Sequence, residues 1–180
     1  REPVARSGRV HDRRAERPPF VRAPDAGVVD VAAVPAALDR DPLGQSIVDT
    51  IGCGLLGSTT PYAKLVTGYV GSWHSAGEAT VWGTQMKASA PFAAMANCAA
   101  CHAWDFDDTV LPAILHPGSV AVPTALAIAE RSVRPVNGKE LVTAIAAGYE
   151  VGNLIGTALG GKKFAADGFY VSVPTIFVAV

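Results

Sequence analysis

Apolar segments rich in alanine and glycine follow one another along the chain from about residue 42, and each is opened by a helix-capping signal. In the first segment, Asp41 can cap the helix and Pro42 suits the first helical position, which predicts a helix over 42–57. Thr60-Pro61 repeats this signal and predicts a helix over 61–70. The apolar residues of the first helix are expected to share one face: Leu43, Ile47, Val48, Ile51 and Leu55. A chain built from such segments is expected to fold as a mostly α-helical domain.

The most apolar of these segments, 91–104, follows Ser89 and consists largely of small residues. Alanine occurs all around the circumference of the expected helix, so neighbouring helices can approach it closely on every side. We therefore expect this helix to lie centrally in the domain. Its end leads directly into an acidic segment, 105–108.

Two further helices are predicted in the second half of the chain. Segment 119–130 contains Pro123, which either lies in the first turn of a helix or kinks it. Asn137 and Glu140 have a spacing close to that of a capping box, and the apolar run 141–159 that follows predicts a long helix. Segment 79–82 is expected to form a short strand as a minor element.

Composition and charge narrow the class of protein. With 180 residues, of which 49% are hydrophobic and 17% charged, the chain can bury one substantial core. With a net charge of −1, the chain has no excess of positive charge to attract nucleic acid or an anionic membrane, so neither is an expected partner. No apolar stretch reaches the roughly 20 residues that a membrane-spanning helix needs. Three cysteines are too few for a secreted disulfide framework, and we expect reduced thiols and a cytoplasmic location.

The N-terminal segment differs from the rest of the chain. Residues 1–27 are rich in arginine and proline and have no apolar periodicity, which predicts a disordered arm. Residues 28–180 are then expected to form the helical domain.

Cys98-Ala-Ala-Cys101-His102 has the form CxxCH, in which two thiols attach a c-type haem and the histidine ligates the iron. Both methionines of the chain precede this motif, and a close-packed alanine helix leaves little room for a porphyrin. A zinc site would need a second CxxC or a histidine pair, which is missing, so no metal is expected. We therefore interpret Cys98 and Cys101 as small core residues and keep a c-type haem protein as an alternative.

The acidic segment DFDD at 105–108 is followed by His116 before a Pro-Gly pair, in an otherwise apolar stretch. Carboxylates and an imidazole close together can transfer protons to and from a small acid. The simpler alternative is that Asp107 and Asp108 cap the next segment or face water.

Several ordered blocks of the chain resemble the MmgE/PrpD family, which includes 2-methylcitrate dehydratase, cis-aconitate decarboxylase and iminodisuccinate epimerase. The similar blocks are Asp49-Thr50-Ile51-Gly52, Trp82-Gly83, Ala96-Asn97, HAWDFDDT from His102 to Thr109, His116-Pro117-Gly118, Asn137-Gly138-Lys139-Glu140 and Ala147-Gly148-Tyr149-Glu150-Val151. Several blocks in the same order are far more specific than any one of them.

The resemblance implies a helical-bundle domain, of which this chain represents the N-terminal part, without the α+β lid of complete members. It also implies cofactor-independent chemistry on a small di- or tricarboxylate, and a homodimer when the protein is complete. Complete members are much longer, and this chain stops at Val180 within an apolar run, so we interpret it as a fragment or a truncated relative.

By the same resemblance, Asp105 and His116 correspond to the family's active-site Asp and His from this region, and His102, Asp108 and Tyr170 are candidates for substrate binding. Asp105 could take a proton next to a substrate carboxylate, while His116 could donate to the leaving group or hold a carboxylate.

Two positions depart from the family pattern. Tyr170 stands where the family usually has an active-site histidine, and tyrosine donates a hydrogen bond but does not shuttle protons near pH 7. Leu154 stands where an arginine commonly precedes Ile-Gly.

Three functional hypotheses follow. The first is a lyase or isomerase of the 2-methylcitrate dehydratase or cis-aconitate decarboxylase type, which acts by proton transfer next to a carboxylate. The second is a degenerate, non-catalytic helical module of the same fold. The third is a c-type haem protein through Cys98, Cys101 and His102.

Overall fold

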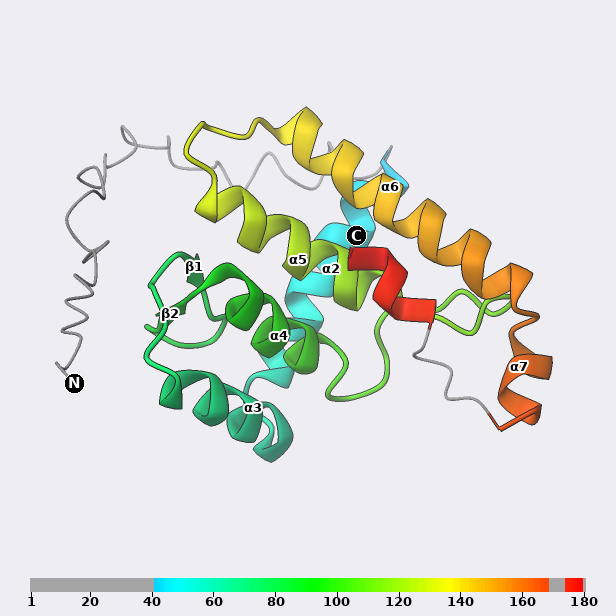
Figure 1. Ribbon diagram of the computed structural model, residues 1–180, viewed down its shortest axis with the longest axis horizontal. Coiled ribbons are helices and arrows are strands. Elements are labelled where there is room, and N and C mark those ends of the chain that lie inside the picture. Colours follow the sequence, from blue (N-terminus) through cyan, green and yellow to red (C-terminus); the bar gives the residue numbers. More distant parts are fainter. Residues whose placement is uncertain (1–40, 169–173, 180) are drawn as a thin grey trace, which may run out of the picture.

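The computed structural model describes residues 41–168 and 174–179, and this part of the chain is mostly α-helical (Figure 1). Its elements in chain order are α2 (Pro42–Gly57), α3 (Pro61–Ser72), β1 (Ala79–Thr80), β2 (Lys87–Ala88), α4 (Ala90–Cys101), α5 (Gly118–Arg131), α6 (Gly138–Ala158), α7 (Lys162–Ala166) and the 3₁₀-helix η2 (Pro174–Ala179). The predicted fold class is thereby confirmed. The arm expected over 1–27 and the candidate residue Tyr170 lie outside the described residues.

Helix α4 lies at the centre of the fold, as predicted, and packs against α2, α3, α5 and both short strands (Figure 1). Its alanines make this possible, since Ala93, Ala96 and Ala100 are all buried. The approach of α2 is so close that a Cβ atom added to Gly57 would lie 1.9 Å from the carbonyl oxygen of Ala100.

Helix α2 begins where the sequence predicts, with Pro42 as its first residue and the Asp41 side chain accepting a 3.1 Å hydrogen bond from the N–H of Leu43. Of the apolar residues expected on one face, Leu43, Ile47 and Ile51 pack against a core cluster that contains α5 and α6 residues, whereas Val48 and Leu55 are about half exposed. The helix also packs on α4, through a side of small residues. The buried residues of that side are Thr50, Cys53, Gly54 and Gly57.

The strand expected over 79–82 is confirmed at Ala79–Thr80, where it pairs antiparallel with β2, a partner that the sequence did not predict. The side chain of Asn97, in α4, is hydrogen-bonded to this hairpin. Its Oδ1 accepts a 2.9 Å hydrogen bond from the N–H of Trp82, and its Nδ2 donates a 2.9 Å bond to the carbonyl of Thr80. The buried amide therefore satisfies two backbone groups that a two-residue strand cannot pair.

Helix α6 runs along α5 on the outer side of the fold (Figure 1). It begins with the predicted capping box: the N–H of Glu140 donates to Asn137 Oδ1 at 3.0 Å, and the N–H of Asn137 donates to Glu140 Oε2 at 3.2 Å. Pro123 lies inside α5 beyond its first turn and is buried.

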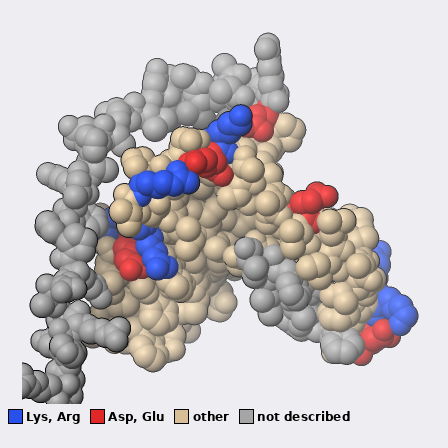
Figure 2. All heavy atoms as spheres, turned by 45° about the horizontal axis from the view of Figure 1, so that its top comes forward, with Lys and Arg blue, Asp and Glu red and all other residues tan. Residues whose placement is uncertain are grey.

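Charged side chains are sparse on the face drawn in Figure 2, and most of them lie beside one of opposite sign. Ion pairs among the described residues include Arg134 with Glu140, at 2.9 Å, and Lys163 with Asp167, at 2.6 Å. Among the described helices, none is long and apolar enough to cross a membrane.

Candidate active site

The loop between α4 and α5 carries the candidate site. Helix α4 ends at Cys101, and His102 follows as its C-terminal cap residue. Asp105 has a φ of 53°, in the left-handed region, which aspartate tolerates better than most residues. Further on, the N–H of Val110 donates a 2.8 Å hydrogen bond to the carbonyl of Leu115. This isolated antiparallel bridge folds the loop back on itself, so that His116 lies beside the acidic segment.

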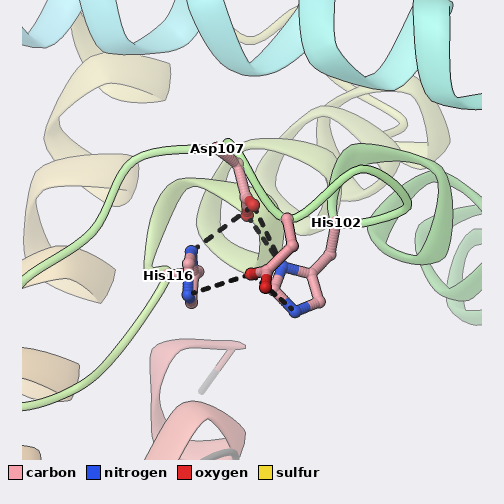
Figure 3. A group of neighbouring side chains, drawn as sticks. His102, Asp107 and His116 are labelled. Atoms are coloured by element: carbon pink, nitrogen blue, oxygen red, sulfur yellow. Dashed lines mark hydrogen bonds and ion pairs between the residues drawn. The ribbon is translucent and has the colours of Figure 1, made fainter.

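Asp107 lies between the two imidazole rings (Figure 3). Its Oδ1 atom is 3.0 Å from Nδ1 of His102 and 3.4 Å from Nδ1 of His116. The Asp107 side chain is fully buried, while those of His102 and His116 are partly exposed. The ring centroids of the two histidines are 4.6 Å apart. One buried carboxylate therefore faces the Nδ1 atoms of both rings.

Asp105 lies beside the opposite nitrogens of the same two rings. Its Oδ1 atom is 3.7 Å from Nε2 of His116 and 3.9 Å from Nε2 of His102, and its side chain is 77% exposed. These separations are those of ion pairs, too long for direct hydrogen bonds. Asp105 is therefore the solvent-facing carboxylate of the cluster, and Asp107 the internal one.

A pocket of about 670 Å³ opens beside this cluster. Its described lining combines His102, Asp105 and His116 with apolar and hydroxyl side chains. The lining residues are Tyr62, Val66, Met95, Cys98, Ala99, His102, Asp105, Ile114, Leu115, His116, Ser119, Val120 and Thr175. His102, Asp105 and His116 are thus brought together at one pocket wall.

Asp108 points away from this pocket. Its Oδ1 accepts a 3.0 Å hydrogen bond from the N–H of Gly118, and its Oδ2 accepts a 2.6 Å bond from the hydroxyl of Tyr149. Burial raises the pKa of Asp108, and the hydrogen bond from Tyr149 opposes that rise. Both carboxylate oxygens are occupied in holding the loop to α5 and α6, and Asp108 is not among the described lining residues.

Asp107 is the site residue that the sequence reasoning did not single out. The acidic segment was recognised as a whole, but nothing in DFDD by itself says which carboxylate faces the histidines. No local signal was available, because Asp105 has a left-handed φ and residues 105–108 do not form an extended strand in which side chains alternate.

The cysteines are core residues, as the sequence interpretation favoured. Cys101 is buried, and its thiol donates a 3.5 Å hydrogen bond to the carbonyl of Thr50. Burial raises the pKa of Cys98 to about 12 and also raises that of Cys101. Attachment of a haem needs both thiols to be accessible, and the Cys101 thiol is buried against the Thr50 carbonyl. The haem hypothesis therefore finds no support in this geometry.

Fold and site together define a mostly helical domain that presents two imidazoles and a carboxylate to a pocket, which is a setting for acid–base chemistry. The chain belongs to the MmgE/PrpD family, since residues 32–179 match the MmgE/PrpD N-terminal domain. The resemblance inferred from the sequence blocks is confirmed.

Curated relatives include cis-aconitate decarboxylases from distant organisms. The human enzyme is 37% identical over 110 residues, which cover 59% of this chain and 23% of the relative. The enzyme from Aspergillus terreus is 28% identical over 127 residues, which cover 69% of this chain and 26% of the relative. The chain thus spans about a quarter of the length of these relatives.

Proposed function

We propose that this chain is the N-terminal part of a lyase or isomerase that acts on a small di- or tricarboxylate. The observation that carries the proposal is the arrangement at the pocket wall: Asp105 Oδ1 lies 3.7 Å from His116 Nε2, and the buried Asp107 lies behind the ring. Membership in the MmgE/PrpD family and similarity to cis-aconitate decarboxylases support the same reaction class.

The roles follow from what each group can exchange with a substrate. Asp105 is exposed and acts as the base that removes a proton next to a substrate carboxylate. His116 presents Nε2 to the pocket, where it donates a proton to the leaving group or holds a carboxylate. His102 presents its own Nε2 beside Asp105 and binds a second substrate oxygen.

Asp107 orients both rings. A carboxylate only accepts hydrogen bonds, so a neutral His102 that bonds to Asp107 carries its hydrogen on Nδ1 and leaves the Nε2 lone pair free, while Nδ1 of His116 faces the same oxygen at 3.4 Å. The same carboxylate stabilises either imidazolium when a proton is taken up, as in other histidine–carboxylate pairs. The pair of rings can therefore both take and release protons at the pocket wall.

The three reactions considered for this family share the first half of this chemistry. Dehydration, decarboxylation and epimerisation each place negative charge next to a carboxylate and need a hydrogen-bond donor or cation near it. Within the described lining, His102 and His116 are the only groups able to carry positive charge. Protonated imidazoles are thus the proposed carboxylate-binding groups of this part of the site.

A non-catalytic helical module is the second candidate. The observation that favours it is the departure from the family pattern at Tyr170 and Leu154, which stand where the family usually has an active-site histidine and an arginine. Such a module would keep the fold and the pocket without completing the reaction.

Assays on the purified chain distinguish the two. Decarboxylation of cis-aconitate and dehydration of 2-methylcitrate are measured together with calorimetric binding of each acid, on the wild type and on Asp105→Asn, His116→Asn and His74→Asn. His74 is an exposed histidine outside the pocket and serves as the matched control. Loss of about 10²–10⁴-fold in rate in the two site variants alone supports the lyase proposal. Undiminished turnover in Asp105→Asn contradicts the proposed base, and complete inactivity of a well-folded sample favours the module.

A further inference from the structure

Three potential ligand atoms lie close together at the pocket wall. They are Nε2 of His102, Nε2 of His116 and Oδ1 of Asp105, with the carboxylate lying 3.9 Å and 3.7 Å from the two nitrogens. Together with Asp107, the four side chains each offer one ligand atom within 4.8 Å of the others. Two imidazoles and a carboxylate that share one centre are a common ligand set for divalent transition metals.

Asp107 provides a carboxylate that can orient both histidine ligands of such a site. Metal-binding histidines generally donate their other ring N–H to a carboxylate or carbonyl, which orients the ring and increases its basicity. Here Asp107 Oδ1 faces Nδ1 of both rings, at 3.0 Å and 3.4 Å (Figure 3). The hydroxyl of Thr109 lies 3.4 Å from His116 Nδ1 and completes the surroundings of that nitrogen.

We propose that His102, His116 and Asp105 bind a divalent transition-metal ion such as Zn²⁺ through Nε2, Nε2 and Oδ1, with Asp107 as the carboxylate behind both rings. The sequence predicted no metal, because it contains neither a second CxxC nor a local histidine pair. The chain brings the histidine pair together only through the fold of the loop, by the Val110–Leu115 bridge.

Distance and charge are both suitable for this ion. Zinc–nitrogen and zinc–oxygen bonds of about 2.0–2.2 Å place tetrahedral ligand atoms roughly 3.3–3.5 Å apart, so the distances from Asp105 Oδ1 to the two Nε2 atoms need to shorten by about half an ångström or less. The Asp105 side chain is 77% exposed and free to move. The carboxylates of Asp105 and Asp107 balance the two positive charges of the ion.

The donor set also favours zinc-like ions over harder ones. Mg²⁺ and Ca²⁺ prefer oxygen ligands, whereas imidazole suits zinc, copper and nickel. Of the two nearby cysteines, Cys101 does not compete for the ion, because its thiol is buried and donates to the carbonyl of Thr50.

Metal binding uses the lone pairs that the proposed proton transfer needs at His116 and Asp105. The metal-bound and catalytic states of the site are therefore mutually exclusive. The metal site does not depend on the lyase proposal, because it requires only the four side chains and can be measured without turnover.

Calorimetric titration of the whole 180-residue chain with ZnCl₂ tests the site. We expect one saturable site, retained when His11 and His74 are both replaced by alanine and strongly weakened in His102→Ala and His116→Ala. Asp107→Asn should lower the affinity by about 10–100-fold, the usual effect of losing a partner behind the ligands. MgCl₂ should give no comparable binding.

Asp105→Asn is the safest variant for folding, since Asp105 is exposed and asparagine also tolerates a positive φ. It should weaken zinc binding while the thermal unfolding midpoint stays unchanged. Titration with Co²⁺ adds a spectroscopic readout: visible d–d bands without a sulfur charge-transfer band identify nitrogen and oxygen ligands.

Three results would overturn the site. They are zinc affinity that is unchanged in folded His116→Ala or Asp105→Asn, a sulfur charge-transfer band that assigns the metal to cysteines, and the absence of saturable zinc binding by the folded wild type.

Discussion

The hydroxyl of Tyr149 donates a 2.6 Å hydrogen bond to Oδ2 of Asp108, which joins α6 to the loop that carries the candidate site. The other oxygen of Asp108 accepts the N–H of Gly118, the first residue of α5. The adjacent residue Asp107 faces the opposite way, toward the two histidines. Two neighbouring carboxylates thus have separate tasks: one attaches the loop to the helices, and the other orients the imidazoles.

Replacement of Tyr149 by phenylalanine should reduce stability. It removes the hydrogen bond to the partly buried Asp108 carboxylate but keeps the ring, and hydrogen bonds to charged groups are worth about 1.5–3 kcal/mol. We expect the free energy of unfolding to fall by about that amount in chemical denaturation. Tyr69→Phe is the control. Tyr69 is 52% exposed, and removal of its hydroxyl should change the free energy of unfolding by less than about 0.5 kcal/mol. Equal effects of the two changes would contradict this role of the Asp108–Tyr149 bond.

The same hydroxyl predicts how stability depends on alkaline pH. Burial, together with the hydrogen bond to Asp108, raises the pKa of Tyr149 above its ordinary value near 10. The unfolded chain loses this proton above pH about 10 while the folded chain keeps it. The contribution of Tyr149 is therefore fully present below that pH and is lost as the pH rises, at up to about 1.4 kcal/mol per pH unit.

Unfolding curves measured between pH 8 and about 11 for the wild type and Tyr149→Phe test this sign. The difference in stability between the two proteins should narrow above pH about 10, because only the wild type has the buried phenol to ionise. A difference that stays constant across this range would show that the pKa of Tyr149 is not raised.

Local signals in the sequence predicted the helices well. The cap at Asp41 and the capping box of Asn137 and Glu140 are formed by residues within one turn, so their spacing alone identifies them. The buried side of α2 was less predictable. Val48 and Leu55 are the larger apolar residues, but the glycine and cysteine side allows closer approach to α4.

The site was predictable only in part, because its geometry depends on contacts between distant residues. Asp105 and His116 were recognised from their residue types and family blocks, whereas the role of Asp107 depends on the bridge between Val110 and Leu115. The partner of Asp108 lies 41 residues further along the chain. No periodicity connects such positions, so only the folded loop reveals which carboxylate faces which partner.

Replacement of Asn97 should destabilise the hairpin of β1 and β2. Its buried amide is the partner of the Trp82 N–H and the Thr80 carbonyl, so Asn97→Ala leaves two backbone groups unpaired at about 1–3 kcal/mol each. We expect a large loss of stability and faster hydrogen exchange at the Trp82 amide. Gln85→Ala, in the exposed turn of the same hairpin, should leave both quantities unchanged. An Asn97→Ala protein with wild-type exchange at Trp82 would refute this role.

Two glycines of α2 offer a matched test of the contact between α2 and α4. A Cβ atom at Gly57 would lie 1.9 Å from the carbonyl oxygen of Ala100, whereas a Cβ atom at Gly52 would meet nothing within 4 Å. Gly57→Ala should therefore force the helices apart and cost about 1–3 kcal/mol, the usual range for overpacking. Gly52→Ala should instead add about 0.5–1 kcal/mol, because alanine favours the helix interior. Thermal and denaturant unfolding measure both changes, and a stabilising Gly57→Ala would show that α2 does not approach α4 as closely as this structure has it.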